Sequence, residues 1–152
     1  MESLLERQAE LGELSRLHHQ AARGVGRLVL LRGEAGVGKT AVIGRFIGSL
    51  DGSARVVRGW CDPLSAPRPL GPLVDMLPQL RGPGASGLAD ALDHGEPQAI
   101  YAKLLGLLGD GHRWVCVIED AHWADGATLD LLRFMAPSGG LDPGAAGGVL
   151  PR

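Results

Sequence analysis

The stretch Gly33-Glu34-Ala35-Gly36-Val37-Gly38-Lys39-Thr40 has the spacing G-x-x-x-x-G-K-T, which is typical of a loop that binds nucleotide phosphates. Glycine adopts backbone conformations that other residues avoid, so successive N–H groups of such a loop can point inward around phosphate oxygens. We expect Lys39 to reach the β- and γ-phosphates and the Thr40 hydroxyl to bind Mg²⁺. All eight residues are therefore predicted to contact a nucleotide.

The residues on either side of this loop follow the order that the motif requires. Residues 27–32 form a short apolar run that predicts a buried strand, and residues 39–50 alternate at helical spacing. A helix that begins at Lys39 adds unpaired N–H groups and a partial positive charge of roughly half an electron at its first turn. The alternative is a glycine-rich turn that precedes a helix by chance. The strand and the helix favour nucleotide binding over that alternative.

A second apolar run, residues 114–118, ends in the two acids Glu119 and Asp120. Ligands of α/β proteins bind at the carboxyl ends of parallel strands, where such acids would lie. In ATPases with the glycine loop, the first acid holds Mg²⁺, usually through water, and the second polarises the attacking water. We therefore predict that Glu119 is a metal-side residue together with Thr40. Asp120 is the expected catalytic base, and Lys39 is the other expected catalytic residue.

Four segments carry a resemblance to a known family: LERQAEL at residues 5–11, the glycine loop, WCDPL at residues 60–64 and EDAHWAD at residues 119–125. Together they resemble the AAA-type ATPase module of large bacterial regulators, the signal-transduction ATPases of the LuxR type, which is similar to the origin-recognition-like AAA domain. The resemblance extends from about residue 4 to residue 135. Many relatives have Asp where this chain has Glu119, but the longer carboxylate can still serve a metal.

The resemblance implies an α/β P-loop NTPase fold, a three-layer sandwich with a parallel sheet, over residues 1–136. It implies ATP and Mg²⁺ as ligands. It also places Arg7 and Glu10 near the base of the nucleotide. For Arg7 the alternative is an exposed helix position with a solvated side chain. Other elements are predicted as helices over residues 4–22, 73–80, 88–108 and 127–136, and as a strand over residues 54–58.

Residues 137–152 are rich in glycine and proline and are predicted to form a flexible tail. In the family fold, a strand after the last helix lies between the loop-bearing strand and the acid-bearing strand and carries a residue that senses the γ-phosphate. That strand and the helical lid are expected to be missing, which predicts a truncated domain. The two functional strands are then expected either to pair directly or to keep unpaired edges.

The predicted function is Mg-ATP binding by a P-loop ATPase module of a signalling or transcription-regulator protein. The resemblance also implies an arginine that a lid or a neighbouring subunit supplies, and this arginine is expected to be missing here. Hydrolysis is therefore expected to be weak or absent, because such an arginine finger alone contributes about 10³–10⁵ in rate. One alternative is a non-enzymatic interaction domain, or a truncated fragment that folds poorly. Another is a small P-loop kinase or GTPase. A GTPase would carry an Asn-Lys-x-Asp run, which is absent, and the arginines between the two motifs are scattered rather than clustered as in a kinase lid.

Composition argues against several other classes of protein. With 152 residues, 45% hydrophobic content and a net charge of −2, the chain is typical of one soluble domain. No block of five basic residues occurs, so no direct nucleic-acid contact is expected. No apolar run approaches the length of about 18 residues that a membrane span needs, and the charged amino terminus is unlike a secretory signal. Cys61 and Cys116 are expected to be reduced thiols, and a cytoplasmic location is predicted. Protein partners and self-association are left open.

Overall fold

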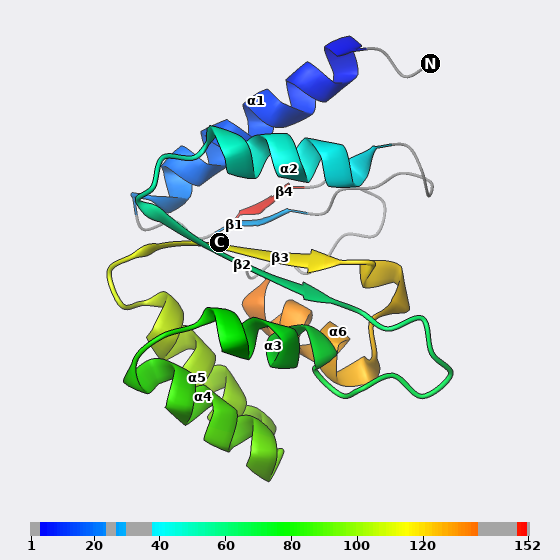
Figure 1. The fold of residues 1–152 in the computed structure, drawn as a ribbon, viewed down its shortest axis with the longest axis vertical. Coiled ribbons are helices and arrows are strands. Elements are labelled where there is room, and N and C mark those ends of the chain that lie inside the picture. The colour runs from blue at the N-terminus through cyan, green and yellow to red at the C-terminus, as the bar shows by residue number, and fades with distance from the viewer. Residues whose placement is uncertain (1–3, 24–26, 30–37, 137–148, 152) are drawn as a thin grey trace. The chain divides into compact units, whose positions relative to one another are not determined.

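The computed structural model describes residues 4–23, 27–29, 38–136 and 149–151. The chain divides into two compact units. The first unit comprises Met1–Asp51 and Arg133–Arg152, and the second unit comprises Gly52–Leu132. Figure 1 labels the helices and strands of both. Within the described ranges, no helix is long and apolar enough to span a membrane.

In the first unit, helix α1 (Leu4–Ala21) packs against helix α2 (Lys39–Ser49), and Figure 1 shows the two helices next to each other. Leu17 of α1 is buried, as are Val42 and Phe46 of α2. The ring of His18 meets that of Phe46 edge to face, with 6.0 Å between the centroids. The two helices therefore share an apolar contact, and both were predicted from their periodicity.

The first unit also holds a short antiparallel pair of strands, β1 (Arg27–Val29) and β4 (Val149–Pro151). Val149–Pro151 lie within the predicted tail of residues 137–152, and they pair with the strand that precedes the glycine loop. The physical reason is that backbone N–H and C=O groups of a strand need partners, and a short apolar segment can supply them. Residues 137–148 lie outside the described residues, and the domain boundary at residue 136 stays a prediction.

The second unit contains the parallel pair β2 (Ala54–Trp60) and β3 (Arg113–Glu119). Their register runs from Ala54 opposite Arg113 to Trp60 opposite Glu119. The parallel pairing confirms the α/β class. Among the described residues β1 pairs with β4 and β3 pairs with β2. The direct pairing of β1 with β3, one of the two expected arrangements, stays a prediction.

Helix α3 (Gly71–Met76) packs on β2, followed by the 3₁₀ turn η1 (Leu77–Gln79). Gly59 of β2 lies directly against the backbone of Pro72, because a Cβ built on Gly59 would lie 2.6 Å from the Pro72 Cα. Only a glycine allows this approach. The contact brings α3 close to the carboxyl end of β2.

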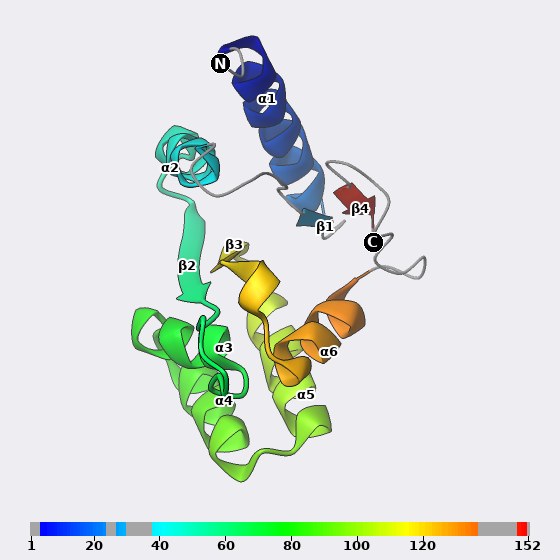
Figure 2. The ribbon, with the colours of Figure 1, turned by 90° about the vertical axis from the view of Figure 1, so that its right-hand side faces the viewer.

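Helices α4 (Pro83–His94) and α5 (Pro97–Leu108) form an antiparallel hairpin, and Figures 1 and 2 both show them side by side. Leu88 and Ile100 are almost fully buried. The single helix predicted over residues 88–108 is therefore wrong. Gly95 ends α4 in the left-handed conformation at φ 72°, and Pro97 starts α5 because its ring presets a helical φ.

After β3 the chain forms the 3₁₀ turn η2 (Ala121–Trp123) and helix α6 (Gly126–Met135). The prediction of a helix over residues 127–136 agrees with α6 to within one residue at each end. Thr128 and Leu131 of α6 are buried within the second unit. The segment that follows the two acids therefore forms a turn and then a helix.

Candidate functional site

The start of α2 carries the last three residues of the glycine loop. Gly38 caps the helix with φ 84° and ψ 22°, a left-handed conformation that favours glycine. Lys39 and Thr40 form the first turn of the helix, and Thr40 is exposed. The first-turn N–H groups of a helix point outward from its N-terminal end, which makes that end suited to an anion. The predicted contacts Gly33, Glu34, Ala35, Gly36 and Val37 lie outside the described residues.

Arg7 of α1 reaches the same place from a distant part of the sequence. A Cβ built on Gly38 would lie 2.5 Å from Nη2 of Arg7 and 2.8 Å from its Cζ, so the guanidinium rests against the glycine Cα. Arg7 is half-buried, whereas Glu10 is exposed. The structure thus brings Arg7 and Gly38 together at the start of α2. The assignment of Arg7 to the nucleotide base stays a prediction.

Glu119, the predicted metal-side acid, is the last residue of β3, and both of its carboxylate oxygens accept hydrogen bonds. Arg58 Nη2 donates to Oε1 at 3.0 Å, and Trp60 Nε1 donates to Oε2 at 2.7 Å. Both donors come from β2, where residues i and i+2 point to the same face of the sheet. The Glu119 side chain is 14% exposed and that of Arg58 is 32% exposed. Sequence reasoning missed both partners.

Asp120, the predicted base, follows β3 directly and has an unusual backbone conformation. Its φ of 56° and ψ of 41° place it in the left-handed region, which costs a non-glycine residue about 1 kcal/mol or more. Its carbonyl accepts a hydrogen bond from the Trp123 N–H at 2.8 Å, which closes η2. The side chain is exposed. Because of this turn, Asp120 does not continue the alternation of side chains along β3, and its side chain is exposed to water.

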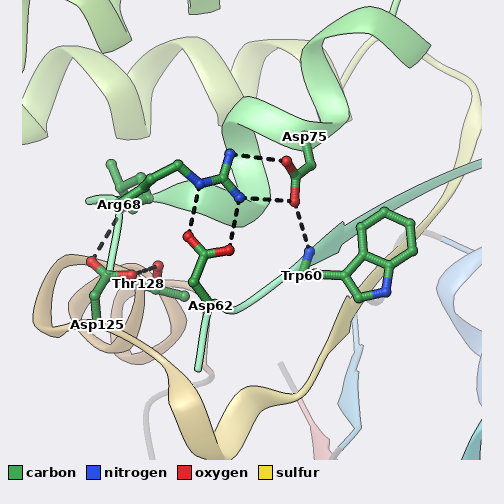
Figure 3. A network of polar contacts seen from close by, with 7 residues as sticks. Trp60, Asp62, Arg68, Asp75, Asp125 and Thr128 are labelled. Carbon is green, nitrogen blue, oxygen red and sulfur yellow. Dashed lines mark hydrogen bonds and ion pairs between the residues drawn. The ribbon is translucent and has the colours of Figure 1, made fainter. Parts of the chain in front are cut away.

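A network of polar contacts holds the connection between β2 and α3 next to these acids (Figure 3). Arg68 donates to Asp62 through Nε at 2.7 Å and to Asp75 through Nη1 at 3.1 Å. Asp75 in turn accepts the backbone N–H of Trp60 at 3.0 Å. The hydrogen bonds from Arg68, followed by its positive charge, hold the pKa of Asp62 below its usual range although burial opposes this. The arginine thus ties the connection to the strand end that carries Trp60.

Asp125 anchors the segment after the acids to the same connection. Its carboxylate accepts the Leu70 N–H at 3.3 Å, the Thr128 N–H at 3.2 Å and the Thr128 hydroxyl (Figure 3). Burial opposes ionisation of Asp125, but these hydrogen bonds outweigh burial and lower its pKa. The Cys61 N–H also donates to the Glu119 carbonyl at 3.0 Å, which extends the β2–β3 ladder by one bond. The EDAHWAD segment is therefore held firmly beside β2 and α3.

Thr40 and Glu119 stay the predicted metal-side residues, and the side chain of each offers a hard oxygen of the kind that Mg²⁺ prefers. Mg²⁺ in nucleotide sites takes one or two protein oxygens and completes its octahedron with phosphates and water. No group of three or more His, Cys, Asp or Glu side chains within the described ranges could hold a metal without such a ligand.

Comparison with known proteins identifies one family. A sequence model of the AAA ATPase domain matches residues 3–144, which is most of the chain and includes both the glycine loop and the two acids. No curated protein and no solved structure matches the chain. The AAA-type resemblance is thereby confirmed at the level of the domain.

Proposed function

We propose that this chain, which belongs to the AAA ATPase domain family, binds Mg-ATP through its glycine loop and its two acids. The observation that carries the proposal is the start of α2, where left-handed Gly38 precedes Lys39 and Thr40. This is the backbone geometry that a phosphate-binding loop needs where it enters its helix. The family match supports the P-loop NTPase sandwich as the complete fold of such a domain.

Each residue then has a defined part in holding the ligand. The first-turn N–H groups of α2 bind phosphate oxygens, and Lys39 neutralises the β- and γ-phosphates. Arg7 adds positive charge beside Gly38. The Thr40 hydroxyl would coordinate Mg²⁺ directly, and the Glu119 carboxylate would hold the ion through a bound water.

Hydrolysis in this proposal depends on Asp120. Bound Mg²⁺ supplies charge stabilisation at the phosphates. The exposed Asp120 carboxylate orients the attacking water and accepts its proton. Turnover by the 152-residue chain on its own is slow, since an arginine finger from a neighbouring subunit accounts for about 10³–10⁵ in rate. We further propose that the module serves a cytoplasmic signal-transduction ATPase of the LuxR-regulator type and does not itself contact nucleic acid.

The test is thermal unfolding of the purified chain with and without Mg-ATP. At a hundred times its dissociation constant, a ligand adds about 2.7 kcal/mol to the free energy of unfolding, so the midpoint should rise by several degrees. Lys39→Ala should abolish the rise. Lys103→Ala is the matched control, because Lys103 is the only other lysine and is exposed on α5 of the second unit.

Three outcomes would count against the proposal. If the thermal unfolding midpoint of the wild type did not change on addition of Mg-ATP, binding by the loop would be excluded. An equal rise in Lys39→Ala would place the ligand elsewhere. A chain without a cooperative transition would favour the alternative of a poorly folded fragment.

A further inference from the structure

We propose that the outer edge of β3, the side away from β2, pairs with β3 of a second copy of this chain. Two chains then form one sheet in the order β2–β3–β3–β2. Among the described residues, the sheet of the second unit has two strands, so each strand has one edge that the other does not use. These two edges differ in how they are covered, and that difference carries the inference. It does not depend on nucleotide binding.

Side chains of the second unit cover the outer edge of β2. The Arg58 N–H donates to Gln79 Oε1 at 2.9 Å, and Gln79 Nε2 donates to the Arg58 carbonyl at 2.6 Å. The Trp60 N–H donates to Asp75 at 3.0 Å. Folded proteins cover their sheet edges because an unpaired row of N–H and C=O groups pairs readily with another chain. At these residues β2 is therefore closed to a further strand.

The outer edge of β3 presents the groups that a further strand needs. The Cys61 N–H donates to the Glu119 carbonyl, so the main-chain groups of Glu119 point towards β2. Successive residues of a strand direct these groups to alternate sides. The N–H and C=O groups of Trp114, Cys116 and Ile118 therefore point away from β2. Within the described part of the chain, no backbone hydrogen bond satisfies them.

The side chains of β3 are apolar, but the strand is poorly covered. Residues 114–118 form an apolar run, which is typical of strands that are buried on both faces. Every residue of β3 is nevertheless half-buried or exposed, and Cys116 is exposed. An apolar strand with an uncovered edge is a surface that associates with another strand.

The charges at the two ends of β3 favour an antiparallel pair of identical strands. Arg113 begins the strand and Glu119 ends it. When two copies run antiparallel with Cys116 opposite Cys116, each Arg113 lies opposite Glu119 of the other copy, on the same face of the sheet. A parallel pair in register would instead place like charges side by side. Arg113 is exposed and has no ion-pair partner among the described residues. The Glu119 carboxylate has lone pairs left for it beyond those that its present donors use.

The same antiparallel register pairs the outward main-chain groups. Cys116 exchanges both hydrogen bonds with Cys116 of the second copy, and Trp114 exchanges both with Ile118. The side chains that then face each other are apolar, Trp114 with Ile118 and Val115 with Val117. A shift of two residues would keep the hydrogen-bond pattern but separate the opposite charges. The ion pairs at the two ends therefore fix the register.

The first experiment measures the mass of the purified chain without nucleotide, by analytical ultracentrifugation from about 1 to about 100 μM. The mass should rise with concentration towards twice the 15.9 kDa of one chain. Arg113→Glu sets a carboxylate opposite each Glu119 and should raise the dissociation constant of the dimer by at least about 10-fold. Arg113→Lys keeps the charge and should still dimerise. Arg45→Glu makes the same change of charge at an exposed position of α2 in the first unit, and it should leave the constant unchanged.

The second experiment determines the register by cross-linking. Opposite residues of a hydrogen-bonded antiparallel pair have Cα atoms about 5.5 Å apart, within the range of a disulfide. With Cys61→Ser, Cys116 is the single cysteine, and diamide, which takes up the two thiol hydrogens, should link two chains. The control is Val117→Cys in a chain without either natural cysteine. It lies two residues out of register with its own copy and should link at least about 10-fold more slowly. Mixing it with the corresponding Val115→Cys chain should restore fast linking.

Three results would overturn the proposal. A chain that stays monomeric up to about 100 μM and does not cross-link would favour the direct pairing of β1 with β3 within one chain. Equal dimerisation of Arg113→Glu and the wild type would place the interface elsewhere. Self-linking of Val117→Cys as fast as that of Cys116 would exclude the register. Cooperative unfolding of Arg113→Glu confirms that this variant is folded, and the cross-linking test does not need it. Binding of Mg-ATP is measured separately, so failure of the dimer leaves the proposed function standing.

Discussion

Trp60 and Glu119 are register partners at the carboxyl ends of β2 and β3, and the indole of one donates to the carboxylate of the other at 2.7 Å. In a parallel pair, residues at the same level point to the same face, so the predicted metal-side acid and its partner are placed together by the ladder itself. A shift of one residue in register would separate them. The strand pairing is therefore part of the candidate site.

Gly38→Ala should weaken both folding and nucleotide binding. At φ 84° a residue with a Cβ is strained by about 1–2 kcal/mol, and the new Cβ would lie 2.5 Å from Arg7 Nη2. Urea unfolding should show a loss of about that size, and calorimetry should show weaker ATP binding. Gly44→Ala is the control: it lies in the same helix with nothing within 4 Å of its Cβ and should gain up to about 1 kcal/mol. Equal stability of Gly38→Ala and wild type would contradict the prediction.

Gly59→Ala should loosen the contact between β2 and α3. The added Cβ would lie 2.6 Å from the Cα and 2.7 Å from the carbonyl carbon of Pro72. Backbone atoms cannot relieve such a clash by changing rotamer, as a side chain can. We expect a loss of about 1–3 kcal/mol in the free energy of unfolding, as for other overpacked positions. Urea unfolding measures it, with Gly52→Ala as the control because its Cβ would meet nothing within 4 Å. A loss no larger than that of the control would mean that α3 does not pack on β2 in this way.

Asp125→Asn should reduce stability at neutral pH but not in acid. The pKa of Asp125 is lowered in the folded chain, so its ionised form stabilises the fold above the unfolded pKa of about 3.9, and this is lost as the pH falls through the lower folded pKa. We expect a difference of about 1–2 kcal/mol at pH 7 that shrinks below about pH 4. Unfolding across this pH range tests it, with Asp93→Asn, exposed on α4, as the control. A difference that is constant with pH would exclude the charge as the cause.

Cys61 should react slowly with alkylating reagents in the native chain. Burial, followed by the negative charges of nearby aspartates with Asp125 first among them, raises the pKa of its thiol from 9.0 to about 11. Two pH units correspond to about 100-fold less thiolate, which is the reactive form. In a Cys116→Ser background, iodoacetamide labelling at pH 8 should be at least about 100-fold slower in buffer than in urea. Similar rates in both would show that Cys61 is not buried beside these acids.

The hydrophobic pattern of the sequence predicted helices and strands correctly where that pattern was clear. The amphipathic pattern of residues 4–22 and the apolar run before Glu119 both correspond to observed elements, α1 and β3. The break between α4 and α5 was missed although Gly95 and Pro97 mark it, because leucine periodicity on both sides continues as if the helix were unbroken. The strand at Val149–Pro151 could not be foreseen from so short an apolar run, since it depends on pairing with β1.

The sequence by itself determined the chemistry of this protein: a glycine loop that ends at Thr40, two acids after an apolar strand, and membership of the AAA ATPase domain family. These features are local, because backbone freedom, charge and periodicity act over a few residues. Only the tertiary structure decided that Arg7 rests on Gly38 and that Arg58 and Trp60 hold Glu119. Such pairs join residues far apart in the chain, and their contact depends on helix packing and strand register, which no single segment encodes.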